Sequence, residues 1–297
     1  MEKIQEAVLA SFIGDALSLG VHWIYDTRII EKEFGDITGY TSPLPNSYHP
    51  TKSTGQLTHY GDQELALLES LSCHKTFYID KFIEDWTAKL NEYSGYRDHA
   101  TKITLRNINQ GIKFPYVGSQ SNELGGVCRI PPLFLLAIDN DKILEMALEQ
   151  TQFTHNSPVL LKVCSFIVEL CFAVISGSSI LEGIETVKKK KEYKDILELV
   201  DKAVKSKGKR TRTEIKRFGQ MCSVRNAFPS LIHLLVSYED DPKAGLIENL
   251  KAGGDSAARS ILYSFIMGLK HGIGWMDEQW IKDLQEKDKI KDLFSDL

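Results

Sequence analysis

The sequence lacks several features that mark particular classes of protein. Its 297 residues carry a formal net charge of only −4, without the strong basic excess expected of a nucleic-acid-binding protein. The amino terminus has an acid beside its single early lysine and no small-residue cleavage site, so we expect no secretory signal. The most apolar stretch, 159–175, is interrupted by Lys162 and Glu169, which favours a buried helix over a membrane span.

The cysteines do not form a disulfide or zinc pattern. There are five of them, an odd number, and none stands in a CxxC pair. Cys164 and Cys171 fall within one apolar helical stretch, where we expect them to pack as small hydrophobic side chains. The sequence therefore favours a reduced, cytoplasmic setting.

Charge is distributed unevenly along the chain. Residues 188–217 contain 13 Lys and Arg against 5 Asp and Glu, a net charge of +8. The rest of the chain, with 23 basic and 35 acidic residues, carries −12. Apolar residues recur on one side of this segment, which predicts an exposed helix face followed by a loop, the alternative being a patch for an anionic ligand.

Helical periodicity dominates, and no alternating strand pattern or tandem repeat is present. We therefore predict an all-α fold with residues 1–297 in a single compact multi-helix domain. The stretch 26–58, rich in Gly, Pro, Ser and Thr, is predicted to be a long loop of functional importance. Beyond the apolar first helix, the expected helices cover 62–73, 79–93, 98–111, 131–150, 157–176, 179–190, 193–206, 224–238, 243–251, 256–271 and 277–295.

Three segments combine glycine, an acid and the start or end of a helix. Each acid has a simple structural explanation. Asp15 lies in an apolar helix, where we expect it to brace neighbouring backbone. Asp62 and Asp255 stand where helices begin and would serve as caps. The helix start at Asp255 also offers free N–H groups to an anion, to which Arg259 would add a bidentate contact.

Together these segments resemble the ADP-ribosylglycohydrolase family, which includes the dinitrogenase-reductase-activating glycohydrolase and the J-crystallins. The resemblance covers nearly the whole chain, and the motifs occur in the family's order. They are Ile13-Gly14-Asp15-Ala16-Leu17, Tyr60-Gly61-Asp62-Gln63, Cys128-Arg129-Ile130-Pro131-Pro132-Leu133, Thr154-His155 and Gly253-Gly254-Asp255-Ser256-Ala257-Ala258, followed by Trp280.

The resemblance implies an all-α enzyme that hydrolyses the bond between ribose C1″ of ADP-ribose and an acceptor. Such enzymes typically use two magnesium ions, held by the second and last motifs and by an acid after the first helix. This chain departs from that pattern at all three places. Tyr60 and Gly61 replace Thr and Asp, Ala257 and Ala258 replace Asp and Thr, and His22 stands where a Glu is expected.

The retained acids suggest two alternatives for the chemistry. His22, Asp62 and Asp255 form a donor set that one Mg, Mn or Zn ion would accept, the histidine favouring the softer ions. Without a metal, Asp62 and Asp255, assisted by His59, would act as acid and base.

Residues near the expected cleft are candidates for substrate binding. Lys52 would neutralise phosphate, and Trp23 or Tyr60 would stack on adenine or ribose. Arg129 would brace the site or contact substrate, whereas His155 is expected to be structural. The full predicted set is Trp23, Lys52, Tyr60, Asn122, Gly125, Gly126, Arg129 and Arg259.

The leading expectation is a hydrolase of the glycosidic bond in an ADP-ribosyl or related nucleotide-sugar compound. Its partner would be a small-molecule or protein-linked ADP-ribose, with no nucleic acid and no membrane. The alternatives are a non-catalytic ADP-ribose or nucleotide binder and a structural, crystallin-like protein on the same fold.

Overall fold

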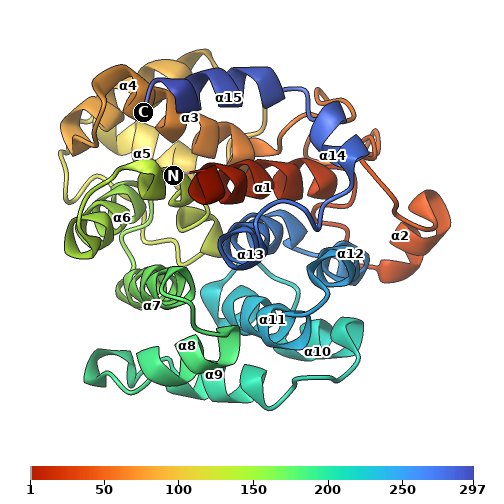
Figure 1. Ribbon diagram of the computed structural model, residues 1–297. Coiled ribbons are helices and arrows are strands. Elements are labelled where there is room, and N and C mark those ends of the chain that lie inside the picture. Colours follow the sequence, from red (N-terminus) through yellow and green to blue (C-terminus); the bar gives the residue numbers. More distant parts are fainter. Residues whose placement is uncertain (1) are drawn as a thin grey trace.

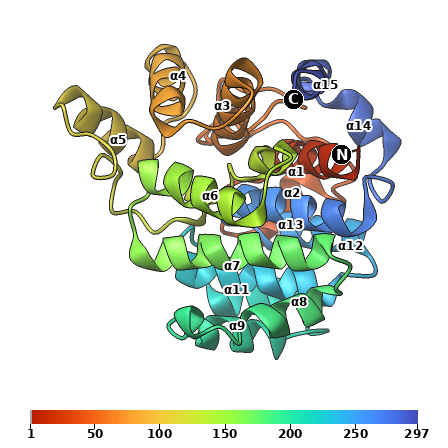
Figure 2. The ribbon, with the colours of Figure 1, turned by 60° about the vertical axis from the view of Figure 1, so that its left-hand side comes forward.

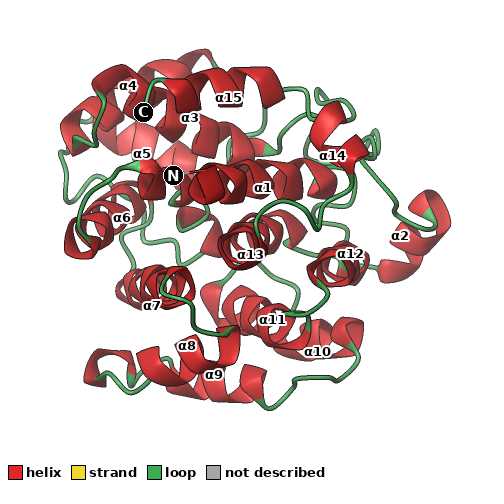
Figure 3. Ribbon diagram, in the orientation of Figure 1, coloured by secondary structure: helices red, strands yellow, loops and turns green. Residues whose placement is uncertain are grey.

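The computed structural model describes residues 2–297, which are built from helices joined by short loops (Figures 1 and 3). At its centre α1 (Glu2–Ser18) packs along α13 (Ser256–His271). Residues 7–18 of α1 and 256–269 of α13 are all buried. Small residues permit the close approach, because a Cβ added at Gly14 would lie 2.4 Å from the Ser264 hydroxyl.

The other helices lie on two sides of this central pair, as Figures 1 and 2 both show. Three of them pack together on one side: α3 (His59–His74), α4 (Ile79–Glu92) and α15 (Lys287–Ser295). The remaining helices are α5 (His99–Asn109), α6 (Asn140–Thr154), α7 (Pro158–Ile175), α8 (Ile180–Val187), α9 (Leu197–Val204), α10 (Thr211–Phe218), α11 (Val224–Ser237), α12 (Pro242–Ala252), α2 (Thr27–Phe34) and α14 (Glu278–Asp283), with 3-10 turns η1 (Leu124–Gly126), η2 (Pro131–Leu135) and η3 (Lys191–Tyr193).

Within residues 2–297 there is no strand, only two isolated bridge pairs, Ser119 with His155 and Glu123 with Ser223. Buried apolar side chains from the first helix to the last form one continuous core. The predicted all-α class is therefore confirmed.

Two predicted helices are interrupted. The stretch 131–150 begins as the 3-10 turn η2, which ends where Leu136 adopts an extended backbone conformation. Asp139 then starts α6 by accepting a hydrogen bond from the Lys142 amide. The stretch 277–295 breaks between α14 and α15, where the Gln285 amide bonds to the Gly55 carbonyl of a distant loop.

The expected loops at 26–58 and after 206 each contain a helix. Asp26 caps α2 through a hydrogen bond from the Arg28 amide, a start signal that the surrounding Gly and Pro residues obscured. The helix α10 buries Ile215 and Phe218 against α11, so tertiary packing stabilises a strongly charged sequence.

The two compositional extremes have ordinary places in the fold. Helix α7 is long and apolar enough to cross a membrane by length and composition, but half of that window is buried inside the protein. In the basic segment 188–217, Ile196 and Val200 are buried whereas most of its lysines are exposed. The predicted solvated helix face is confirmed there.

Candidate functional site

The candidate site forms where the end of α1 meets the start of α13. The Trp23 amide donates to the Gly254 carbonyl and the Gly254 amide donates to the Ile24 carbonyl, both at 2.8 Å. Trp23 has a left-handed backbone conformation, with φ of 62°, in this turn. The two segments thereby bring His22 beside Asp255, with 3.9 Å between Nδ1 and Oδ1 and both side chains fully buried.

Asp255 is a buried carboxyl group without hydrogen-bond partners of good geometry on either oxygen. Burial raises its pKa from 3.8 to about 7, and the negative charge of Glu123 adds to the shift, against the opposing charge of Arg259. Arg259 donates to Asn249 Oδ1 and to the Gly253 carbonyl, each at 2.6 Å, whereas its buried Nη1 has no hydrogen-bond partner. Burial therefore favours the protonated form of Asp255 far more than water does.

His22 presents a free donor to the same place. Its Nδ1 accepts a hydrogen bond of 3.3 Å from the Ala257 amide, which assigns the proton of the neutral ring to Nε2. Burial, with the nearby rings of His49 and His59, lowers the pKa of His22 well below 6.5, so the ring stays neutral.

Unpartnered polar atoms gather around this pair. Buried polar groups normally have hydrogen-bond partners, so a cluster of exceptions marks a place where a ligand or water belongs. Within residues 2–297, the buried atoms without a partner on this pair and its neighbours are Asp255 Oδ1 and Oδ2, Ser256 Oγ, Arg259 Nη1, His22 Nε2, His49 Nδ1, His59 Nε2, Trp23 Nε1 and Tyr60 OH.

Aromatic side chains cover the pair. The Trp23 ring stacks on His22 with centroids 4.4 Å apart and meets the edges of Tyr48 and Tyr96 at 4.8 and 5.3 Å. Tyr48 is 53% exposed, so this wall reaches the surface. Apolar ring faces beside a few unpartnered donors are what a nucleotide or sugar site needs.

A cavity of about 610 Å³ opens between 119–123 and 221–223. Glu123 lines it, half-buried, and accepts a hydrogen bond of 3.2 Å from the Cys222 thiol. The negative charge of Glu123 contributes to the raised pKa of Asp255, and Glu123 thereby links the cavity to the buried pair, although neither His22 nor Asp255 lines the cavity. Glu123 was missed in the sequence, although it directly follows Asn122, a predicted binding residue that also lines the cavity.

The start of α3 is organised differently. Thr58 caps the helix by accepting from the Tyr60 amide, and its own amide and hydroxyl donate to Asp15 at 2.7 and 2.6 Å. The predicted brace by Asp15 is confirmed. Asp62 Oδ2 accepts from Lys52 Nζ at 2.5 Å and from the Tyr93 hydroxyl. Asp62 is thus a paired carboxylate and not the cap.

The donors do not fit the metal sites that the sequence suggested. Among the described residues 2–297, no three His, Cys, Asp or Glu side chains form a group that could hold a metal ion. The predicted set of His22, Asp62 and Asp255 is therefore not assembled, because Asp62 turns to Lys52 while the other two pair with each other.

His59 was predicted to assist catalysis, and its ring lies beside the pair, with its centroid 5.9 Å from that of His22 and 5.1 Å from that of Trp23. Its Nδ1 meets His49 Nε2 at 3.0 Å, and its Nε2 lies 3.7 Å from the Asp98 carboxylate. Burial, with a smaller contribution from Lys52, lowers the pKa of His59 to about 3. A base this weak is a poor proton acceptor at neutral pH, so we assign His59 to the support of the aromatic wall.

Several predicted binding residues are internal supports. Arg129 is 2% exposed, and its guanidinium donates to Gln63 at 2.9 Å, Gln150 at 3.1 Å and Thr154. The expectation that Arg129 contacts substrate is wrong, since its donors are spent within the core. Arg259 is also fully buried and bonds to Asn249 and Gly253, but its Nη1 has no partner, so its contact with an anion stays a prediction.

The two glycines that were predicted to bind substrate lie behind site residues. Gly125 packs against the Tyr60 ring, and Gly126 packs against His155. His155 accordingly has the structural place expected for it, with Nδ1 2.8 Å from the Thr154 hydroxyl.

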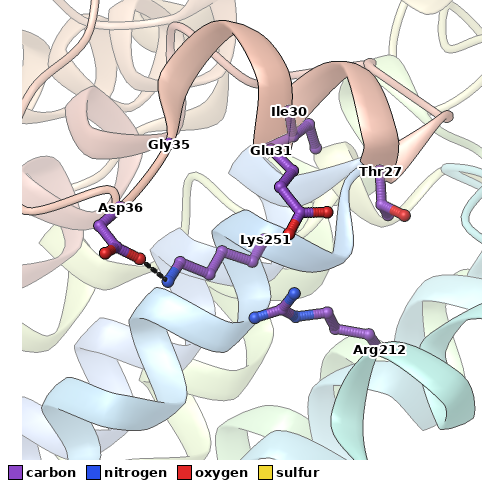
Figure 4. Close-up of a pocket in the computed structure, with 7 residues that line it drawn as sticks. All are labelled: Thr27, Ile30, Glu31, Gly35, Asp36, Arg212 and Lys251. Carbon is purple, nitrogen blue, oxygen red and sulfur yellow. Dashed lines mark hydrogen bonds and ion pairs between the residues drawn. The ribbon is translucent and has the colours of Figure 1, made fainter.

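A second pocket of about 270 Å³ lies between α2, α10 and α12 and contains none of the predicted residues (Figure 4). Lys251 Nζ pairs with Asp36 at 3.1 Å, and Arg212 forms two hydrogen bonds to Glu248 at 2.9 and 3.2 Å. Its cations are already neutralised, so the cluster around Asp255 remains the stronger candidate.

Comparison with known proteins decides the family. A family model described as ADP-ribosylglycohydrolase matches residues 1–297. The chain belongs to this family. Crystallin J1A of Tripedalia cystophora is 18% identical over 97% of this chain and 94% of its own length. A solved structure titled "ADP-ribosylglycohydrolase-related protein complex" covers 99% of this chain and 96% of its own, with a TM-score of 0.76 and 17% identity.

The ADP-ribosylglycohydrolase resemblance drawn from the ordered motifs is therefore confirmed, and so is the fold. Both relatives are distant in sequence, and one of them carries the name of a crystallin. What this member of the family does depends on its own site residues.

Proposed function

We propose that this chain is a hydrolase of the glycosidic bond in an ADP-ribosyl or related nucleotide-sugar compound, with Asp255 as its general acid. One observation carries the proposal: a fully buried Asp255 whose carboxyl oxygens accept no hydrogen bond of good geometry, in the last motif of an ADP-ribosylglycohydrolase. Burying such a group is costly, and stability alone gives no reason to keep it.

Two carboxyl groups suffice for the reaction. Glycosidic cleavage needs an acid for the leaving atom and a carboxylate for the attacking water. Asp255, with a pKa of about 7, would give its proton to the leaving atom as the bond to C1″ breaks. Glu123 would take a proton from water as the water oxygen bonds to C1″. Exchange with solvent would then return a proton to Asp255 and remove the proton from Glu123.

The neighbouring donors suit the substrate's sugar. His22 Nε2–H, Trp23 Nε1–H and the Tyr60 hydroxyl are unpartnered and would hydrogen-bond to ribose oxygens. Trp23 and Tyr48 would stack on an adenine or ribose face. The Trp23 ring covers His22, and Tyr48 packs against Trp23. The rings of Trp23 and Tyr48 would therefore have to move aside before substrate could enter.

The direct test is release of ADP-ribose from ADP-ribosylated arginine, from ADP-ribosylated serine and from small ADP-ribosides, followed by chromatography. Parallel reactions would contain Mg, Mn, Zn or a chelator. We expect turnover of at least one substrate and its loss in Asp255→Asn. No turnover of any substrate, or equal rates for wild type and Asp255→Asn, contradicts the proposal.

A non-catalytic role is the second candidate, favoured by the crystallin relative and by the departures from the family's acidic motifs. Calorimetry with ADP-ribose distinguishes two non-catalytic roles, a nucleotide-binding protein and a structural protein. Binding without turnover identifies a nucleotide-binding protein, whereas neither binding nor turnover identifies a structural protein.

A further inference from the structure

We propose that Lys52 is a built-in counter-ion for Asp62, and that the site consequently works without the divalent metal expected in this family. The inference rests on the proposed function for the location of its active site, which it deepens. Contacts in two parts of the site support it. The first half is the start of α3 with Asp62, and the second half is the start of α13 with Asp255.

The first half is closed by protein groups. Asp62 Oδ2 accepts from both Lys52 Nζ and Tyr93 OH, and the Lys52 and Asp62 side chains are only 15% and 18% exposed. A lysine ammonium is a compact point charge with three donors, so it neutralises one carboxylate as a metal would. A divalent ion that approached Asp62 would be repelled by this ammonium or would have to displace it.

A second carboxylate cannot be added beside Asp62. A Cβ at Gly61 would lie 2.2 Å from Asp15 Oδ2, so an aspartate there would collide with the Asp15 carboxyl. Asp15 in turn is held by the amide and hydroxyl of Thr58. Neither position 61 nor Asp15 can therefore supply an oxygen ligand to a metal beside Asp62.

The second half of the site offers too few oxygens. Asp255 is followed by Ser256 and then by Ala257 and Ala258, which are fully buried and carry no side-chain oxygen. Its neighbour is His22, a nitrogen ligand. Magnesium prefers near-octahedral oxygen coordination, and no comparable group of acids is present among residues 2–297.

The Lys52–Asp62 pair also fastens the loop before α3. The Lys52 amide bonds to the His49 carbonyl at 3.1 Å, and its ammonium lies 5.8 Å from the Tyr93 ring centre. Tyr48 and His49, on the same turn, belong to the aromatic wall. Lys52 is thus a positioning residue, since it acts on the site through the loop.

The test measures metal and stability independently of turnover. The full chain is treated with a chelator, desalted, then mixed with magnesium or manganese chloride or with sodium chloride at equal ionic strength. Bound metal is measured by elemental mass spectrometry and the melting temperature by calorimetry. We expect no stoichiometric metal in wild type and the same melting temperature in all salts. Stoichiometric metal, or a rise specific to a divalent ion, overturns the inference.

Variants test the role of Lys52. We expect Lys52→Met to lower the melting temperature by a few degrees, and magnesium or manganese to restore part of the loss by neutralising Asp62. Lys52→Arg should resemble wild type. Lys81→Met, which removes an exposed lysine 2.8 Å from Glu84, is the matched control and should change little.

A Lys52→Met protein as stable as wild type, or one whose stability ignores divalent ions, overturns the inference. These readouts do not depend on activity. A wild type that hydrolyses nothing yet shows the predicted metal and melting behaviour supports the Lys52 inference and contradicts only the proposed function.

Discussion

Asp15 and Asp255 are two buried carboxyl groups in the same domain, and their environments differ in one respect. Both are fully buried, and burial raises the pKa of each from 3.8 to about 7. Asp15 accepts two short hydrogen bonds from Thr58, whereas Asp255 accepts none of good geometry. A raised pKa is common to both, so the missing partners, and not the pKa, distinguish the candidate catalytic group from the structural one.

The largest effect expected from this difference is on activity. Replacing Asp255 by Asn removes the acid while keeping its shape, and general acid catalysis typically contributes about 10²–10⁴-fold. We expect kcat/KM for ADP-ribose release to fall by at least about 100-fold. The melting temperature should not fall, because no hydrogen bond to protein is lost. Reduced activity together with a destabilised fold would remove the contrast with Asp15.

The second effect is on stability. Asp15→Ala leaves the buried amide and hydroxyl of Thr58 without an acceptor, each costing about 1–3 kcal/mol. We expect the free energy of unfolding in urea to fall by roughly 2–6 kcal/mol. Asp255→Ala is the matched variant and should lose less. Equal losses at the two positions would mean that partner contacts do not separate them.

The pH dependence of stability sharpens the comparison. The folded protein keeps a proton on Asp255 between pH 3.8 and about 7, where the unfolded chain has lost it. The free energy of unfolding therefore falls as pH rises through this window and then levels off. Asp255→Asn removes this contribution, so its stability relative to wild type should grow across the window. A difference that stays constant from pH 4 to 8 would show that Asp255 has an ordinary pKa.

Glu123 is expected to set the pH profile of activity. If Asp255 acts as an acid, kcat/KM of wild type falls as pH rises above about 7. Glu123→Gln removes a negative neighbour that raises the pKa of Asp255, so this limb should move to lower pH. The rate at its optimum should also fall, since water loses its base. If the alkaline limb of the pH profile does not shift, Glu123 does not affect the pKa of Asp255.

The smallest effect concerns Tyr60. Its buried hydroxyl has no partner, so Tyr60→Phe should change the free energy of unfolding by less than about 0.5 kcal/mol. Tyr263, equally buried, donates to the Pro242 carbonyl at 3.0 Å, and Tyr263→Phe should cost about 1 kcal/mol. Urea titration of both variants is the measurement. A larger loss for Tyr60→Phe would mean that its hydroxyl already has a structural partner.

Local signals predicted much of the fold. Apolar periodicity located α4 and α7 almost to the residue, since a regular helix repeats its buried positions. It failed at 131–150, where the extended Leu136 and the capping Asp139 divide a continuous apolar stretch. It also failed at α10, which is helical because α11 and α12 pack against it.

The site was only partly predictable for the same reason. The motif order brought His22 and Asp255 together correctly, because both follow directly from the family's helix ends. No local pattern could show that Lys52 reaches Asp62, or that Glu123 lies near Asp255, since these contacts depend on how three distant segments fold. Arg129 was expected to brace the site or contact substrate, and only its buried contacts to Gln63 and Gln150 show that it braces the core.

The backbone exchange between Trp23 and Gly254 also bears on how the protein is made. His22 and the Ala257 amide that bonds it are 235 residues apart. Most of the chain must leave the ribosome before α13 can contact α1. Until then α13 cannot cover the apolar faces of α1. Packing of α1 against α13 is therefore a late step of folding, which follows synthesis of nearly the whole chain.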